Sequence, residues 1–433
     1  MPKALIMSVG AGIGINEKIA TESLANALVF SIKQQNPDEI FFVASLKSRR
    51  TVLPKILQQT KIKNHIIKIE NPDDINYIYG VLLPKFKKIR RQYDNVAVDC
   101  TSGTKTMTSA MAILGTICDV NSLSYISGER SGGLVQAGTE KLITVQPRLV
   151  VAEQKMKTAI EFFNHNQFEV AIAILEEIKE SIRSQDLTKR VDPLLSLAKA
   201  YSLWNKFEHD KAFQIIRGMK MKQLADNKSF LGRLLEAKKE ANEESSPKKG
   251  VVRPPKLKRP EPYYIADMIN NAERTGDEKK YDDAVARLYR TIELIAQYTL
   301  KKEYNLQTSN VNLDQVPEEL LKKWPRPTTG TLKLPLEKDY ELLKAKKHPL
   351  GEKYLRDKKL KDLLSKRNAS ILAHGLNPVD QNTFITLQKK TKEYAKIVIE
   401  NLSELLKAAK FIKWPEVNQT KPDYIMKNPV SEA

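Results

Sequence analysis

The sequence predicts an α/β Rossmann-like N-terminal domain, then a helical connector and an all-α C-terminal domain. Three observations support this order. Short apolar runs alternate with helical patterns over residues 1–148, strand-like runs disappear after them, and a basic, proline-rich stretch divides the helical remainder. The chain has 433 residues, and at about 100 to 200 residues per domain this length corresponds to two to four domains.

Six short apolar runs in the first domain are predicted strands. Most of them do not alternate with polar residues, which is typical of strands buried on both faces of a sheet. They are Lys3–Val9, Glu39–Ala44, His65–Lys68, Asn95–Asp99, Ser122–Ile126 and Leu142–Val145. Between them lie the helical patterns Glu17–Gln35, Arg50–Thr60, Asp73–Arg91 and Thr104–Asp119. Strands alternating with helices predict a parallel sheet wrapped by helices over residues 1–148.

The rest of the chain is predicted to be helical around one linker. The connector, 149–246, contains the amphipathic hairpins Ala152–Glu180 and Asp192–Lys222. Pro247–Pro262 has five prolines and six Lys or Arg in 16 residues, so it is a basic linker rather than a helix. An all-α domain follows at 263–412, and 413–433 form a tail. The helices expected in that domain are Ile265–Thr275, Tyr281–Tyr304, Asp339–Lys346, Gly351–Lys366 or beyond, and Gln381–Phe411.

Composition limits the classes of protein that the chain can belong to. It has 72 Lys and Arg against 52 Asp and Glu, a net charge of +20 that favours a polyanionic partner. Two cysteines, Cys100 and Cys118, do not provide a disulfide framework or a four-cysteine zinc site, and the five histidines form no metal-binding pair. No apolar run reaches the roughly 18 residues of a membrane helix. We therefore expect a cytoplasmic protein without a metal or other cofactor.

The loop after the first strand carries alternating glycines. Gly10, Gly12 and Gly14 follow Ser8 and lead into a helix, whereas a dinucleotide fingerprint has the spacing G-x-G-x-x-G. The acidic residue that reads a ribose near the end of the second strand is replaced by basic residues such as Arg49. A nucleotide-dependent oxidoreductase and a purely structural turn remain alternatives for this loop.

The loop Asp99–Met107 runs from a buried strand into a helix. Its glycine, its hydroxyl side chains and Lys105 place backbone N–H groups and a positive charge at a helix N-terminus, which favours phosphate. The spacing is not that of a P-loop, because G-x-x-x-x-G-K is absent. The alternative is a helix capped by Ser or Thr with Lys105 in solvent.

At this loop the sequence resembles the CARF domains of ancillary effectors in type III CRISPR systems. Such domains bind cyclic oligoadenylates at the two-fold axis of a dimer. The resemblance implies a binding pocket for this ligand, with cyclic tetra-adenylate favoured and cyclic hexa-adenylate as the alternative. Some relatives slowly cleave their ligand, for which Thr101, Ser102 and Lys105 are the candidates here. The implied pocket residues are Ser8, Gly10, Gly12, Thr101, Ser102, Gly103, Thr104 and Lys105.

A second group of polar residues lies near the C-terminus. Arg367 and His374 are seven positions apart, so on a continuous helix they share a face two turns apart. Gly375 and Pro378 then end the helix and place His374 in its last turn. A histidine at this position is commonly a cap, and only its context favours catalysis.

That context is a second resemblance. Arg, six residues and His, with Asn368 directly after the Arg, resembles the motif of HEPN ribonucleases. The helix from Tyr281 is similar to the opening of this domain in CARF–HEPN proteins, and Arg287, Arg290 and Glu293 are expected either to support the site or to form surface ion pairs. Both motifs in one chain identify it as a member of the CARF–HEPN ancillary ribonucleases.

The resemblance implies a homodimeric endoribonuclease that cuts single-stranded RNA in antiviral defence when a cyclic oligoadenylate binds. RNA supplies its own nucleophile in the 2′-hydroxyl, so His374 would transfer a proton, Arg367 would hold the phosphate and Asn368 would orient one of them. One alternative stays open, in which an inactive HEPN fold is a dimer scaffold and the protein is a cyclic-nucleotide sensor or transcriptional regulator.

Overall fold

The computed structural model describes residues 2–12, 16–131, 134–181, 185–245, 259–324 and 331–415. Gly14, most of the predicted linker and most of the predicted tail lie outside these ranges. The chain forms two compact units. One comprises Met1–Met156 with Glu177–Ser184, and the other comprises Lys157–Glu176 with Gln185–Ala433.

The first unit is built on a six-stranded sheet with the order β3-β2-β1-β4-β5-β8. The first five of these strands in the chain are parallel, as predicted, but β8 pairs with β5 in the antiparallel direction. The chain reaches β8 through a short hairpin instead of a helix, and a parallel crossover needs a longer connection. The strands are β1 Lys3–Val9, β2 Glu39–Ser45, β3 Lys63–Ile69, β4 Asn95–Asp99, β5 Ser122–Ser127, β6 Arg130–Ser131, β7 Leu134–Val135 and β8 Lys141–Val145.

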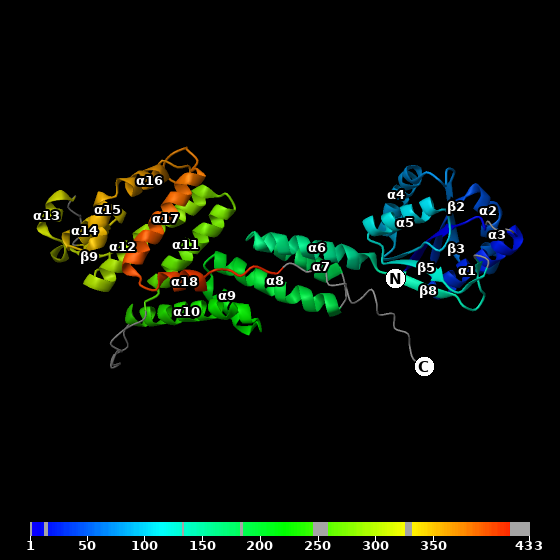
Figure 1. Cartoon of the computed structure of the whole chain (residues 1–433), viewed down its shortest axis with the longest axis horizontal. Coiled ribbons are helices and arrows are strands. Elements are labelled where there is room, and N and C mark those ends of the chain that lie inside the picture. The colour runs from blue at the N-terminus through cyan, green and yellow to red at the C-terminus, as the bar shows by residue number, and fades with distance from the viewer. Residues whose placement is uncertain are drawn as a thin grey trace. The chain divides into compact units, whose positions relative to one another are not determined.

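Helices cover both faces of this sheet (Figure 1). Leu5 and Met7 of β1 pack toward the face covered by α1 and α3, while Ala4 and Ile6 pack toward α4 and α5. The alternate burial on two faces explains why β1 is apolar at every position from Ala4 to Met7. The α/β Rossmann-like prediction is confirmed. The helices are α1 Glu17–Gln35, α2 Leu46–Arg50, α3 Val52–Gln59, α4 Ile75–Gln92 and α5 Lys105–Ile117.

Helical hairpins follow the sheet. The turns between α6 and α7, between α8 and α9, and between α11 and α12 share one shape, with Asn166, Phe207 and Lys279 respectively in the left-handed region. In each turn two backbone N–H groups donate hydrogen bonds to carbonyl oxygens of the preceding helix, which is a common way for a helix to end. The helix α10 was not predicted. The elements are α6 Pro147–Asn164, α7 Phe168–Ser181, α8 Gln185–Asn205, α9 His209–Gly218, η1 Lys222–Leu224 and α10 Ala225–Ser245.

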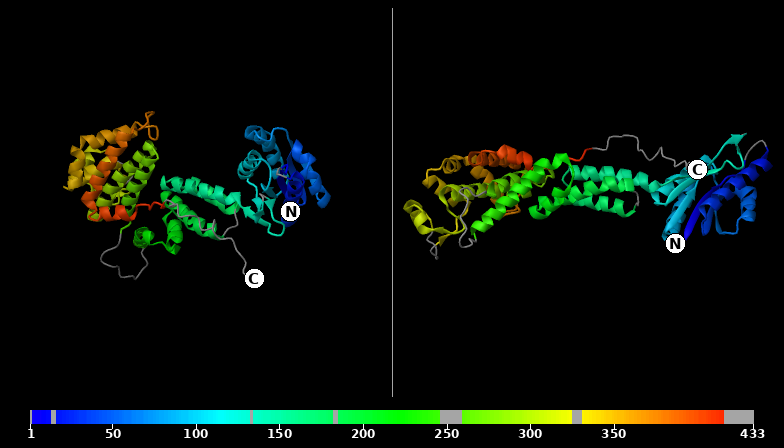
Figure 2. Two further views of the ribbon diagram at one scale, coloured as in Figure 1. Left: turned by 45° about the vertical axis from the view of Figure 1, so that its right-hand side comes forward. Right: turned by 90° about the horizontal axis from the view of Figure 1, so that it is seen from below.

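The C-terminal helices, yellow-green to red in Figure 2, form one bundle. Within it, α12 contacts α11, α14, α16 and α17. The predicted helix over Gly351–Lys366 is two helices, because Asp357 caps the second with its carboxylate. The predicted helix over Gln381–Phe411 is likewise interrupted after Val398. The elements are α11 Glu261–Asp277, α12 Tyr281–Tyr304, β9 Val311–Asn312, η2 Leu313–Gln315, α13 Glu318–Lys323, β10 Thr331–Leu332, α14 Leu336–Ala345, α15 Pro349–Arg356, α16 Lys358–Asn368, α17 Gln381–Val398 and α18 Leu402–Ala408.

Candidate functional site

The sheet reverses its winding between β1 and β4. From β1 the strand order continues to β2 and β3 on one side, and from β4 it continues to β5 on the other. Ligands of open α/β sheets bind outside the carboxyl ends of the strands at such a switch point. The eight predicted ligand-binding residues lie at this position, in the loops after β1 and β4 and in the adjoining ends of β1, which holds Ser8, and α5, which begins at Lys105.

Two serines join these loops. The hydroxyl of Ser8 donates to the carbonyl oxygen of Ser102, and the hydroxyl of Ser102 donates to the carbonyl oxygen of Ser8 over 2.9 Å. The Ser102 hydroxyl also accepts from the N–H of Gly10 at 3.0 Å. Both side chains are buried. The structure therefore brings these predicted residues together, but their hydroxyls hold the two loops to each other.

The glycines of the two loops allow close backbone approach. A Cβ at Gly10 would lie 3.0 Å from the backbone nitrogen of Gly103, and one at Gly12 would lie 2.7 Å from the side chain of Thr21. Gly12 and Gly103 also have φ of +68° and +119°, in the region that favours glycine. These positions fix the shape of the loops.

The remaining predicted residues stand at the start of α5. Thr101 Oγ1 accepts from the N–H of Ile126 at 2.9 Å, and Thr104 Oγ1 caps α5 by accepting from the N–H of Met107 at 3.2 Å. Lys105 is exposed and, within the described part of the chain, has no ion-pair partner. Among the described residues, the first two backbone N–H groups of α5, those of Lys105 and Thr106, also lack acceptors. Backbone donors and Lys105 thus remain available to an anion.

A buried carboxylate underlies these loops. Asp99, the last residue of β4, accepts from the Ser31 hydroxyl, from Gln35 Nε2 at 3.4 Å and from the N–H of Thr101 at 2.8 Å. Burial raises the pKa of Asp99, and these hydrogen bonds oppose the rise. The predictions from the sequence did not include Ser31 or Gln35, because nothing in the pattern of α1 distinguishes them from other small or polar residues.

The predicted geometry of the second motif is wrong. The helix α16 ends at Asn368, so Arg367 lies in its last turn while His374 lies beyond it, in a series of tight turns. Arg367 and His374 therefore do not share a helical face. The backbone N–H of His374 instead donates to the carbonyl oxygen of Asn368 at 3.1 Å.

Close backbone contacts hold residues 367–377, from the last turn of α16 onward, a segment that we call the motif turn. The N–H of Gly375 donates to the carbonyl oxygen of Ser370 at 3.1 Å. A Cβ at Gly375 would lie 1.9 Å from the carbonyl oxygen of Ala369, so only glycine fits there. Downstream of the turn, the N–H of Val379 donates to Asp282 Oδ2 of α12 at 3.1 Å. The backbone around His374 is thus closely determined.

The side chains of this site have few partners. His374 is exposed, and Arg367 is half-buried with its guanidinium carbon 4.3 Å from the centroid of the Tyr289 ring. Arg367 Nη1 donates to Asn368 Oδ1 at 3.2 Å. Among the described residues, no carboxylate lies within ion-pair distance of Arg367. An unneutralised guanidinium and an exposed imidazole are suited to bind a phosphate and to transfer a proton.

Arg287 and Arg290 of the earlier helix form ion pairs, which was one of the two expectations for them. Arg290 pairs with Glu293 at 2.8 Å, and Arg287 donates to Asn271 Oδ1 at 2.6 Å and pairs with Asp283. The residue of α12 that contacts the motif is Tyr289. No feature of the sequence distinguishes Tyr289, because its position in the helical period does not separate it from core aromatics.

Family models match the two helical regions. A model described as the Csm6 6H domain matches residues 151–244, and one described as the Csm6 HEPN domain matches residues 255–398. Together they span more than half of the chain. The chain belongs to the Csm6 family. It is accordingly a CARF–HEPN effector of type III CRISPR systems, as the two motifs predicted.

A solved structure agrees with this fold. Csm6 of Enterococcus italicus, determined with a cyclic hexa-2′-fluoro-hexa-dAMP, is 12% identical, has a TM-score of 0.57, and the match covers 94% of this chain and 98% of that one. Can2 of Sulfobacillus thermosulfidooxidans, determined with cyclic tetra-adenylate, is also 12% identical but has a TM-score of 0.23, covering 50% and 68% of the two chains. The second score is too low to indicate a common fold. No curated protein matches the chain.

The segment after α18 returns to the first hairpin of the Csm6 6H domain. Phe411 stacks on Tyr201 with ring centroids 4.0 Å apart, and the Arg274 guanidinium lies 3.8 Å from the centroid of the Phe411 ring. Asn164, the last residue of α6, exchanges two hydrogen bonds with the backbone of Trp414, of 2.8 and 3.0 Å. The end of the HEPN region is thereby tied to the helix that follows β8.

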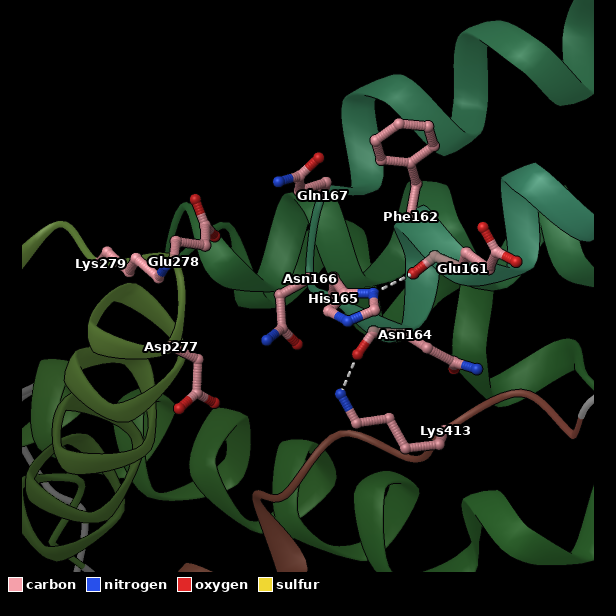
Figure 3. A pocket seen from close by; sticks show the side chains of 10 residues that line it. All are labelled: Glu161, Phe162, Asn164, His165, Asn166, Gln167, Asp277, Glu278, Lys279 and Lys413. Carbon is pink, nitrogen blue, oxygen red and sulfur yellow. Dashed lines mark hydrogen bonds between the residues drawn. The ribbon is translucent and has the colours of Figure 1, made fainter.

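A cavity of about 790 Å³ lies beside this segment (Figure 3). The end of α6, the turn between α11 and α12, and Lys413 line it, and the Lys413 ammonium donates to the carbonyl oxygen of Asn164. Burial and the neighbouring Glu273 raise the pKa of Asp277, against the effect of Lys413. Charges of both signs around the cavity indicate a junction between helices rather than a site for one class of ligand.

Buried charged side chains also connect the 6H helices to the HEPN helices. His209 of α9 lies 2.8 Å from Asp267 of α11, whose other oxygen is 3.7 Å from Arg274. Arg274 Nε donates to Asn205 Oδ1 at the end of α8, over 2.9 Å. Burial lowers the pKa of Arg274 to about 10. Since breaking a buried pair leaves an uncompensated charge, this network resists independent movement of the 6H and HEPN helices.

None of the described helices combines the length and the apolar character that a membrane span requires.

Proposed function

We propose that the protein is a metal-independent endoribonuclease that a cyclic oligoadenylate activates to cut single-stranded RNA. The observation that supports this best is the motif turn, which presents Arg367 and His374 without competing partners on a rigid backbone in a Csm6 HEPN region. Such an arrangement leaves both side chains free for a substrate.

The chemistry follows from the substrate. The 2′-oxygen of RNA attacks the adjacent phosphorus, the P–O5′ bond breaks, and a 2′,3′-cyclic phosphate and a 5′-hydroxyl result. His374 would take the proton of the 2′-hydroxyl or give one to the leaving 5′-oxygen, and Arg367 would stabilise the added negative charge on the phosphorane. Asn368, which accepts from Arg367, would orient the guanidinium. DNA should not react because it lacks the 2′-hydroxyl.

A second copy of the chain is expected at this site. Three apolar side chains of the motif turn are exposed, Leu376 most of all with 86% of its surface. Exposing apolar surface to water costs free energy, and this cost is removed if the three side chains pack against another protein surface. They flank His374, so a homodimer formed here would bring two copies of the motif together. The three are Ile371, Leu372 and Leu376.

For the activator, we propose binding at the loops after β1 and β4. Free N–H groups at the start of α5 and the Lys105 ammonium would bind its phosphates. Cyclic tetra-adenylate, the favoured ring, stays a prediction, and cyclic hexa-adenylate is the alternative. If the ligand is cleaved there, Lys105 is the remaining candidate, because hydrogen bonds within the protein already occupy the hydroxyls of Thr101 and Ser102.

The connector would couple activator binding in the first domain to the HEPN helices. We propose domains at 1–148 for ligand sensing, 149–246 for the connector and 263–412 for RNA cleavage, with the linker at 247–262 and the tail from 413. The helix α6 follows β8 directly, and its last residue, Asn164, holds the segment after α18. Displacement of α6 would therefore act on the HEPN helices through Asn164 and through the buried pairs around Asp267.

His374→Ala tests the function. With cyclic tetra- or hexa-adenylate and a fluorogenic RNA, we expect the variant to lose at least about 100-fold in cleavage rate, the usual contribution of a general acid or base. His165→Ala, which removes an exposed histidine from the turn after α6, should cleave like the parent. Calorimetry should give both variants the parent's affinity for the activator, and excess EDTA should not stop the reaction.

Two results would count against the proposal. Undiminished cleavage by His374→Ala would remove His374 from the mechanism. Binding of the activator without RNA cleavage by the parent protein would favour the alternative, a cyclic-nucleotide sensor in which the HEPN region is a scaffold.

A further inference from the structure

The guanidinium of Arg367 lies over an aromatic ring from another helix. Its central carbon is 4.3 Å from the centroid of Tyr289, which lies at the middle of α12. A guanidinium at this distance from a ring face is attracted by the π electrons, and its flat shape allows it to stack. The contact joins α16, which ends one residue after Arg367, to the central helix of the domain.

Few other contacts restrain this guanidinium. Within the described part of the chain, its one hydrogen bond is to Asn368, the next residue, which moves with it. No carboxylate of the described residues pairs with it. An arginine side chain loses about 2 kcal/mol of rotamer entropy when it is fixed. Without the Tyr289 ring, that entropy would oppose the orientation of the guanidinium at a substrate phosphate.

Tyr289 is itself held firmly. Its neighbours Leu288 and Ile292 are fully buried, and α12 packs against four other helices. A guanidinium that stacks on a ring is covered on one face only, and its N–H groups, which point outward in the plane of the group, stay free for other acceptors. The ring can therefore fix the orientation of Arg367 without using the donors that a phosphate needs. A carboxylate partner could not do this, since it would occupy the donors and neutralise the charge.

We infer that Tyr289 is a positioning residue for RNA cleavage: its ring holds the Arg367 guanidinium in the orientation that receives the scissile phosphate. The inference rests on the proposed function, because it assigns Arg367 to that phosphate. Tyr289 is not itself a catalytic residue, since it acts through Arg367.

The ring, rather than the hydroxyl, makes the contact. Burial raises the pKa of Tyr289, while Arg367 opposes the rise, so the hydroxyl stays protonated at neutral pH. The hydroxyl has no hydrogen-bond partner within the described residues. Phenylalanine at this position keeps the stacking face, and leucine removes it with little loss of apolar volume.

Steady-state cleavage by the activated full-length protein tests the inference. We expect Tyr289→Leu to lower kcat on the order of tenfold, the equivalent of a partly desolvated cation–π contact, with a smaller change in KM. Tyr289→Phe should recover most of that loss. Tyr304→Leu is the matched control, because Tyr304 is also half-buried on α12 and lies under a cation, Lys346 at 5.4 Å. It should cleave like the parent.

A double-mutant cycle separates positioning from a general effect on folding. In the Arg367→Lys background, whose ammonium cannot stack in the same way, Tyr289→Leu should cause less than a twofold further loss. Equal losses in both backgrounds, or a Tyr289→Phe variant as impaired as Tyr289→Leu, would overturn the inference. Full activity of Arg367→Lys and Arg367→Ala would instead overturn the proposed function, so the two failures are distinguishable.

Discussion

The loops after β1 and β4 differ from the motif turn in which of their groups are free to bind a ligand. In the loops, the hydroxyls of Ser8 and Ser102 are buried and fix the two backbones to each other. In the motif turn, backbone groups bond to backbone groups, and the side chains of Arg367 and His374 remain open. One site offers mainly N–H groups, whereas the other offers mainly side chains.

This difference corresponds to two kinds of chemistry. Backbone N–H groups do not titrate and cannot transfer protons, so they are suited to bind an anion without reacting with it. A guanidinium and an imidazole stabilise charge and move protons, so they are suited to a reaction. A glycine that tolerates no Cβ is common to both sites, at Gly12 and at Gly375. Substitutions at each site therefore test whether the first site binds the activator and the second cleaves RNA.

Gly375→Ala should have the largest effect. Its Cβ would lie 1.9 Å from the carbonyl oxygen of Ala369, which forces the motif turn to open and moves His374. We expect RNA cleavage to fall on the order of 100-fold or more, since a displacement of about 1 Å costs that much. The rate with saturating activator measures this.

The control for this variant is Gly218→Ala at the end of α9. A Cβ there meets no atom within 4 Å, so cleavage should not change. Activator affinity should also be unaffected by Gly375→Ala. Near-parental cleavage by Gly375→Ala would mean that the shape of the motif turn does not matter for the reaction.

Lys105→Ala should have a smaller effect, and this effect should be on activator binding. Lys105 is exposed at the start of α5 without an ion pair among the described residues, so its loss should weaken the activator's phosphate contacts without disturbing the fold. We expect affinity to fall on the order of tenfold, as for one charge-assisted hydrogen bond of about 1.5 kcal/mol. Calorimetric titration measures it.

Lys61→Ala is the matched control, because Lys61 is exposed but precedes β3, at the sheet edge away from the strands' carboxyl ends. RNA cleavage at saturating activator should be the same in all three proteins. Equal affinities for Lys105→Ala and Lys61→Ala would show that the activator does not contact Lys105.

Much of the fold could be predicted because its signals are local. The apolar residues of β1 and β4, buried on both faces, form short unalternating runs, and the observed bounds of both strands equal those predicted. The same holds for α1 and α12, which end at residues with left-handed backbone, Asn36 and Asn305. The antiparallel direction of β8 was missed, because it depends on how the chain between β5 and β8 folds back.

The motif turn could not be predicted for the opposite reason. Residues such as Ala369, Leu372 and Ala373 are good helix formers, so local preference favours a continued helix. Contacts distant in the sequence decide otherwise, above all the hydrogen bond from Val379 to Asp282 of α12. The contact between Arg367 and Tyr289 is also tertiary, since the two residues are 78 positions apart in the sequence. Residue types predicted both sites, but only the fold supplied their geometry.

Two buried carboxylates, Asp99 and Asp339, differ in their hydrogen bonding. Asp99 receives hydrogen bonds from four residues, whereas neither oxygen of Asp339 on α14 has a partner within the described structure. Burial and the neighbouring Glu293 raise the pKa of Asp339 to about 8, although Arg290 opposes this. Folding thus holds Asp339 in its protonated form at neutral pH.

Asp339→Asn should therefore change stability rather than cleavage. Between about pH 4 and pH 8 the folded state retains a proton on Asp339 that the unfolded state releases, so the parent's free energy of unfolding falls as pH rises. The amide cannot ionise, and we expect the variant to be more stable at pH 8.5 by on the order of 1 to 3 kcal/mol, with the difference vanishing near pH 4. Thermal unfolding across this range measures it. Asp362→Asn, an exposed change on α16, should keep the parent's slope, and an unchanged slope for Asp339→Asn would mean that Asp339 is already ionised in the folded protein.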